Sequence, residues 1–199
     1  MTNDAQWVVQ KSDTSQVQVF KYDGSSFVLN QTITVNFTIS RVRLSDNHLF
    51  LYIVENGASF DIYKFGGSSF AYAQSITGLG SGNKEISSTA DGSVVIIGNP
   101  STNSAYIYDY NNGTGQYSLA TSIADGTNYT PLLCAIRQDK MYVSITTSSQ
   151  PTLFLNSSYQ QIGTVSTPAS STYFSYDGTV WLMADNSNVY VYTEKCPAS

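Results

Sequence analysis

The stretch "KYDGSSFVLNQTI" (21–33) returns 43 residues later as "KFGGSSFAYAQSI" (64–76). Both copies carry an aromatic residue before a Gly-Ser-Ser turn, then a Ser-Phe pair, and both end in a Gln-Thr-Ile or Gln-Ser-Ile phrase. Gly and Ser at this point predict a hairpin between two strands. A phrase repeated in register indicates a structural unit that is used more than once.

The repeat extends beyond these two phrases. An acidic turn precedes an apolar run in four places, at Asp46, Asp91, Asp139 and Asp177. A shift of 45 residues aligns Asp46 with Asp91. A period of about 40–47 residues with only strand-like segments is typical of β-propellers. A β-sandwich also has short strands, but it seldom repeats one phrase in register. We therefore predict an all-β protein, a single β-propeller domain over 1–199 with four-stranded antiparallel blades and five repeats, at about 6–38, 39–84, 85–130, 131–170 and 171–195.

The strands expected third in each repeat alternate two kinds of side chain. In "FDIYKF" (60–65), Phe60 and Ile62 share one face, and Tyr63 and Phe65 share the other. The strand expected second is almost continuously apolar, which indicates burial on both faces. Each sheet is therefore expected to pack between two neighbouring sheets.

One segment carries a resemblance to known families. "STADGSVVIIGNPSTNSAYIYDYNNGTGQYSLATSI" (88–123) resembles the blades of WD-repeat-like and integrin-type FG-GAP propellers. The resemblance is to the superfamily and implies a propeller. The Gly-His and Trp-Asp signatures of WD repeats are absent. "DYNNGTG" (109–115) has too few carboxylates for the calcium loop of FG-GAP repeats, and it is interpreted as a hairpin turn.

The two ends of the chain enter the pattern in the middle of a repeat. The first repeat begins at its second strand, "QWVVQ" (6–10), and the last stops after its third, "NVYVYTE" (188–194). Three complete blades and two partial ones are expected. Either the chain closes as a five-bladed ring with two thin blades, or it is part of a larger ring. Because open blades expose strand edges and apolar faces, self-association or a tightly held protein partner is expected.

The composition excludes several classes of function. The net charge is −5, and the nine Lys and Arg are scattered, which argues against nucleic-acid binding. No apolar run has the length of a membrane span. The start of the chain lacks the pattern of a signal peptide, whereas N-x-Ser/Thr sequons would permit an extracellular origin, so the compartment is left open. These sequons lie at Asn30, Asn36, Asn112, Asn128 and Asn156.

No motif for catalysis, metal or cofactor stands out. His48 is the only histidine, and it is expected in a surface turn without a nucleophile beside it. One histidine with Cys134 and Cys196 does not make a conventional zinc site, and pairing of the two cysteines is left open. The chain is predicted not to be an enzyme and to need no cofactor. A glycoside hydrolase, the less favoured alternative, would have to use Glu55 and Asp185, the only acids in the loops that follow the second strands.

Loops after the second strands are the remaining candidates for a binding surface, because loops on a rigid scaffold often carry function. They are neutral and rich in hydrogen-bonding side chains. We predict a non-enzymatic interaction or structural module, with a neutral-glycan-binding propeller as the alternative. The candidate residues for binding a partner or glycan are Glu55, Asn56, Asn99, Asn103, Gln150 and Asn186.

Overall fold

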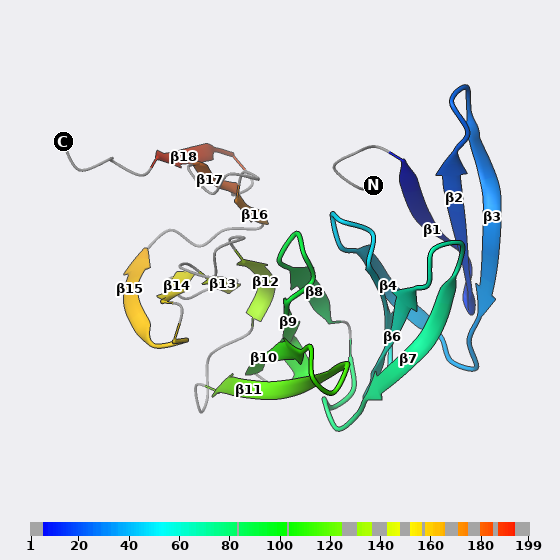
Figure 1. Ribbon diagram of the computed structural model, residues 1–199. Helices are drawn as coiled ribbons and strands as arrows, with labels where there is room; N and C mark the ends of the chain where they lie inside the picture. Colours follow the sequence, from blue (N-terminus) through cyan, green and yellow to red (C-terminus); the bar gives the residue numbers. More distant parts are fainter. Residues whose placement is uncertain are drawn as a thin grey trace.

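In the part of the chain that this computed structural model describes, five antiparallel β-sheets follow one another along the sequence (Figure 1). The all-β prediction is confirmed. Figure 1 shows the sheets side by side in an open series, with the two end sheets apart from each other. The structure describes residues 6–82, 84–102, 104–124, 131–136, 143–147, 152–156, 158–165, 171–174, 180–184 and 187–193.

Three four-stranded sheets lie between two three-stranded end sheets. Sheet 1 holds β1 (Trp7–Asp13), β2 (Gln16–Tyr22) and β3 (Phe27–Thr34). Sheet 2 holds β4 (Ile39–Leu44), β5 (Phe50–Glu55), β6 (Phe60–Phe65) and β7 (Phe70–Ile76). Sheet 3 holds β8 (Glu85–Ser88), β9 (Val94–Asn99), β10 (Ser104–Asn111) and β11 (Gln116–Ala124), with a short 3-10 helix at Pro100–Thr102. Sheet 4 holds β12 (Pro131–Ile136), β13 (Val143–Thr147), β14 (Thr152–Leu155) and β15 (Gln161–Val165), and sheet 5 holds β16 (Ser171–Phe174), β17 (Val180–Ala184) and β18 (Val189–Thr193).

Each sheet is a simple meander, in which every strand pairs with the next one along the chain. The repeated phrases form the hairpins β2–β3 and β6–β7. Gly24 (φ 103°) and Gly67 (φ 100°) occupy equivalent turn positions with positive φ, which glycine adopts without a steric penalty. A β-bulge follows at equivalent points, after Val19 in β2 and after Ile62 in β6. The two copies of the phrase therefore share the same turn, the same strand register and the same β-bulge.

The sheets pack face against face. We call the side of a sheet turned toward the preceding sheet its front face, and the side turned toward the next sheet its rear face. One core lies between sheets 1 and 2 and another between sheets 2 and 3. A third contains rear-face residues of sheet 3 together with Leu155 of sheet 4. In β6, Phe60 and Ile62 lie in the rear core while Tyr63 and Phe65 pack at the front, as the alternation predicted.

A glutamine of each repeated phrase joins two sheets. Gln31 of sheet 1 donates to the Phe70 carbonyl and accepts from the Phe70 N–H, both at 2.8 Å. Gln74 of sheet 2 makes the same pair of bonds to the backbone of Tyr117 in sheet 3, at 2.9 and 2.8 Å. Because the bonds satisfy backbone groups of the next sheet, they fix how successive sheets are stacked.

The acidic turns differ from the sequence alignment by one position. Asp91 accepts hydrogen bonds from Thr89 Oγ1 (2.7 Å) and the Ser93 N–H (2.9 Å). In sheet 2 the residue in this role is Asn47, which accepts from Ser45 Oγ (2.8 Å) and the Leu49 N–H (3.1 Å). The prediction that paired Asp46 with Asp91 was therefore wrong at this turn.

Candidate functional site

Of the loop residues predicted for binding, the structure describes Glu55, Asn56 and Asn99. Asn103, Gln150, Asn186 and Asp185 lie outside the described residues. Asn99 is fully buried; its amide donates to the Leu79 carbonyl and accepts from the Ser101 N–H at 3.0 Å. Glu55 ends β5 and accepts a hydrogen bond from Ser59, and the Asn56 N–H donates to the Thr38 carbonyl at 2.9 Å. The structure thus places Glu55 and Asn56 on one loop and Asn99 inside the protein.

His48 lies in the predicted turn, where its ring is only partly exposed. It is half-buried, with its centroid 5.8 Å from that of Trp7 and 5.2 Å from that of Phe65. The position in a turn is as predicted, and the ring is partly covered there. Trp7 of sheet 1 and Phe65 of sheet 2 lie beside it.

A polar hollow of about 490 Å³ opens where Glu55 ends its strand. Asp61 of β6 pairs with Ile53 of β5 and with Ser75 of β7, so Glu55, Asp61 and Ser75 share the front face of sheet 2. The apolar pattern of that face gives way to polar residues at this edge of the sheet. The hollow is lined by Asn36, Phe37, Glu55, Ser59, Asp61, Tyr72 and Ser75.

Burial raises the pKa of Asp61, and the negative charge of Glu55 raises it further, while a hydrogen bond from Ser75 opposes the shift. The buried Lys84 donates to the Gly57 and Gly82 carbonyls rather than to either carboxylate. Burial lowers the pKa of Lys84, and the charge of Glu55 opposes that shift. The hollow therefore presents two carboxylates and serine hydroxyls beside the exposed ring of Tyr72.

Sequence reasoning found Glu55 but missed Asp61 and Tyr72. Comparison of the repeats could have singled out Asp61. It occupies the position held by Gln18 in the preceding repeat and by Tyr106 in the following one. A carboxylate there breaks the pattern of the unit. Among the described residues, no group of three or more His, Cys, Asp or Glu is placed to hold a metal ion.

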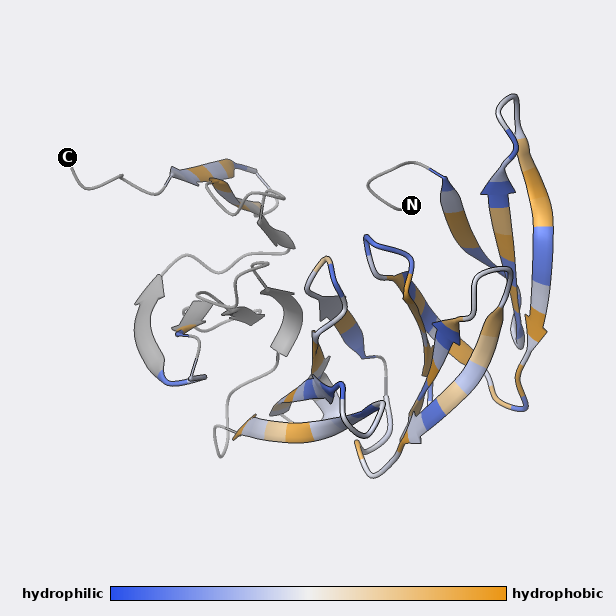
Figure 2. Cartoon of the chain, viewed as in Figure 1, coloured by the Kyte–Doolittle hydropathy of each residue, from blue (hydrophilic) through white to orange (hydrophobic). Residues whose placement is uncertain are grey.

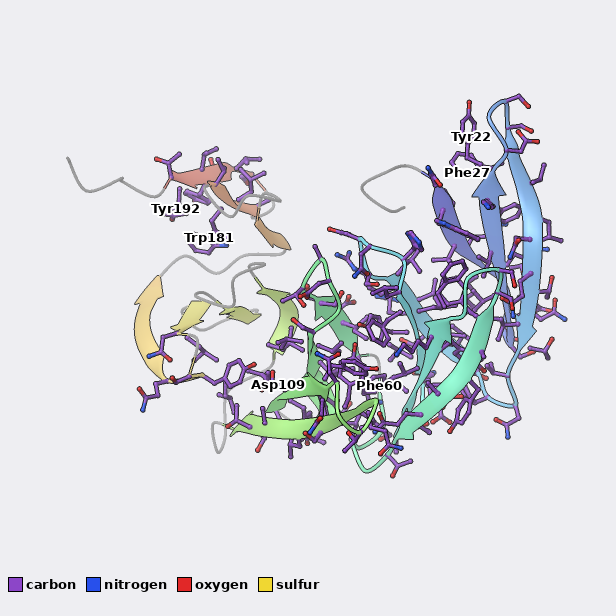
Figure 3. All side chains as sticks on the ribbon, in the orientation of Figure 1. Tyr22, Phe27, Phe60, Asp109, Trp181 and Tyr192 are labelled. Carbon is purple, nitrogen blue, oxygen red and sulfur yellow. The ribbon has the colours of Figure 1, made fainter. Side chains whose placement is uncertain are left out.

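Near the β2–β3 hairpin, the front face of sheet 1 is apolar and partly exposed. Across the strands Val8 pairs with Phe20, Phe20 with Leu29, and Tyr22 with Phe27, so all five share this face. Tyr22, Phe27 and Leu29 are 41%, 42% and 53% exposed. Figure 2 shows the apolar stretch at the start of β3, and Figure 3 shows Tyr22 beside Phe27 at the tip of the hairpin.

The rear face of sheet 5 is likewise apolar and exposed. Leu182 pairs with Val191, and Ala184 pairs with Val189. Val189 and Val191 are 69% and 62% exposed. The opposite face holds Trp181, which is buried, with its ring 4.5 Å from that of Tyr192 (Figure 3).

No protein-family model matches the chain, and no curated protein matches its sequence. In the parts of the chain that the structure describes, there is no helix long and apolar enough to cross a membrane. The function is therefore inferred from the packing of the sheets.

Proposed function

We propose that the chain is a β-propeller repeat protein that acts as a non-enzymatic protein-interaction module through the exposed faces of its end sheets. We call these the end faces: Val8, Phe20, Tyr22, Phe27 and Leu29 on sheet 1, and Leu182, Val189 and Val191 on sheet 5. The repeat, the meander sheets and the face-to-face packing support the propeller. The two end sheets lie apart (Figure 1) and each exposes an apolar face, which supports a function in binding another protein.

One observation carries the proposal: the end-face residues have buried counterparts inside the protein. Val191 occupies the position of Ile107 in sheet 3, which is fully buried. Phe27 occupies the position of Phe70, which is 3% exposed. Contiguous exposed apolar surface of this kind marks interaction sites. Full burial of one such side chain contributes about 1.5–3 kcal/mol, so covering both faces provides a strong driving force for association.

A charged end face tests the proposal. We expect Val191→Asp to remove an association that wild-type protein shows in sedimentation velocity. If wild type is instead monomeric, we expect it to bind the apolar dye anilinonaphthalene sulfonate, and Val191→Asp to reduce the fluorescence by about half, because one of two end faces is lost. Leu119→Asp is the matched control, since Leu119 is 54% exposed on sheet 3 but lies on no end face. A monomer whose dye fluorescence is the same in all three proteins would contradict the proposal.

A second candidate function is binding of a neutral glycan in the hollow at Asp61. The observation that favours it is the combination of an exposed Tyr72 ring with carboxylate and hydroxyl groups in one hollow. Sugar rings stack on aromatic side chains, and ionised carboxylates accept hydrogen bonds from sugar hydroxyls.

For this candidate we expect Asp61→Ala to weaken binding on an array of neutral oligosaccharides at pH 7 by about tenfold, the equivalent of one lost charge-assisted hydrogen bond. The raised pKa of Asp61 means that its charge is lost earlier than usual as the pH falls, so binding should weaken already above the ordinary aspartate value of 3.8. Leu119→Asp serves again as the control. Absence of any bound neutral glycan, or equal binding by Asp61→Ala, would remove this candidate.

A further inference from the structure

We propose that the partner is a second copy of this chain, and that the front face of sheet 1 in one copy packs on the rear face of sheet 5 in the other. The inference rests on the proposed interaction function and names its partner. It follows from a rule that the cores between sheets 1 and 2 and between sheets 2 and 3 obey: the strand positions that form the rear face of one sheet pack on the strand positions that form the front face of the next sheet.

The cores between sheets show this rule. Between sheets 1 and 2, Val17 and Val19 of the rear face pack with Leu51 and Ile53 of the front face. Between sheets 2 and 3, Phe60 and Ile62 of the rear face pack with Val95, Ile97, Tyr108 and Tyr117 of the front face. The end faces left over are one rear face and one front face, so they form the pair that the rule joins.

The end faces also match residue by residue. Val189 and Val191 stand where Phe60 and Ile62 stand in sheet 2, and those two residues are 0% and 1% exposed. On the other side, Val8 stands where Leu51 stands, and Leu51 is fully buried beneath sheet 1. A second copy would therefore cover each end face with the kind of surface that covers its counterpart.

Charge does not oppose this pairing locally. The chain carries a net charge of −5, but the eight residues of the two end faces are all uncharged. Burying them places no unpaired charge in the interface, which would cost several kcal/mol. A strand edge alone would not select its partner in this way, because backbone groups pair with any exposed edge.

The proposed interface joins two different surfaces, so after the first contact one copy keeps a free rear face and the other copy keeps a free front face. Such an interface either closes into a ring or continues into an open assembly. It also makes a strict prediction for variants. A copy with a blocked front face and a copy with a blocked rear face can still pair with each other, once.

The experiment uses Phe27→Asp to block the front face and Val191→Asp to block the rear face. Both sites are exposed, so both variants should fold, which circular dichroism and the thermal midpoint will check. By native mass spectrometry and sedimentation at micromolar concentration we expect wild type and Leu119→Asp to form assemblies of two or more copies. Each blocked variant alone should be monomeric, with association weakened at least about 100-fold by the buried charge. An equimolar mixture of the two should form dimers, and only dimers.

The outcomes separate this inference from the proposed function. If one blocked variant still dimerises alone and the mixture forms no mixed dimer, like faces pair with like and the inference is wrong. If wild type is monomeric but binds the apolar dye in a manner that Val191→Asp reduces, the second copy is not the partner while the interaction function stands. If wild type is monomeric and the dye does not distinguish the variants, both are wrong.

Discussion

Phe70→Ala is expected to destabilise the protein by about 3–5 kcal/mol, whereas Phe27→Ala, the same substitution in the twin phrase, should change stability by no more than about 0.5 kcal/mol. Phe70 is 3% exposed and packs in the core between sheets 1 and 2, with its ring 5.2 Å from that of Phe65. Phe27 is 42% exposed, because none of the sheets that the structure describes covers the front face of sheet 1. The difference comes from position in the series of sheets rather than from local sequence.

Denaturant unfolding measures this difference. Both substitutions should be made in a Val191→Asp background, so that every protein is compared as a monomer and end-face contacts do not enter the free energy of unfolding. Equal destabilisation by the two substitutions would mean that sheet 1 is covered on both faces, contrary to the structure.

Gly92→Ala is expected to cost about 2–5 kcal/mol, which is more than Gly24→Ala at about 1–2 kcal/mol. Both glycines have positive φ, 70° and 103°, so both substitutions introduce backbone strain. A methyl group on Gly92 would also lie 2.5 Å from Phe50 Cδ2 and 3.0 Å from Tyr52 Oη, whereas one on Gly24 would meet nothing within 4 Å. The excess for Gly92 therefore measures how tightly the turn of sheet 3 packs against sheet 2.

The measurement is again the free energy of unfolding from urea titration, with the slope compared to confirm that the unfolded states are alike. If the two variants lose the same stability, the turn at Gly92 does not pack under Phe50 and Tyr52. The stacking of sheets 2 and 3 would then need revision.

Much of the fold was predictable because the repeat is strong. The alternation in β6 assigned Phe60 and Tyr63 to opposite faces, and the structure agrees. The strand order of the end sheets also follows from where the chain enters and leaves the repeat. The alignment of the turns was less reliable. Asn47 and Asp91 both accept hydrogen bonds within their turns, so an amide and a carboxylate can fill the same turn position. Matching Asp with Asp in the sequence therefore aligned the wrong residue, Asp46, with Asp91.

The sites were less predictable than the fold. Asn99 looked like a displayed loop residue, but the 3-10 helix after β9 turns its amide toward the Leu79 carbonyl. Asp61 lay unnoticed in a strand, because a single acid in an alternating segment is normally solvated. Asp61 belongs to the hollow only because residues from other segments line the same hollow. No local sequence pattern predicts that those segments lie next to Asp61.

Each repeated phrase has two structural roles, one in its turn and one at its glutamine. Their Gly-Ser-Ser turns set the hairpins, and Gln31 and Gln74 bond each hairpin's sheet to the next sheet. Packing between sheets is therefore specified within every unit. Among the residues that the structure describes, no sheet packs on the front face of sheet 1 or on the rear face of sheet 5.

Native mass spectrometry of the wild-type chain across a dilution series tests the proposed end-to-end pairing most directly. We predict species at integer multiples of the chain mass, at least two copies at micromolar concentration, that dissociate on dilution and are absent from Val191→Asp. A wild-type chain that remains monomeric at every concentration, with the same mass distribution as Val191→Asp, would contradict it.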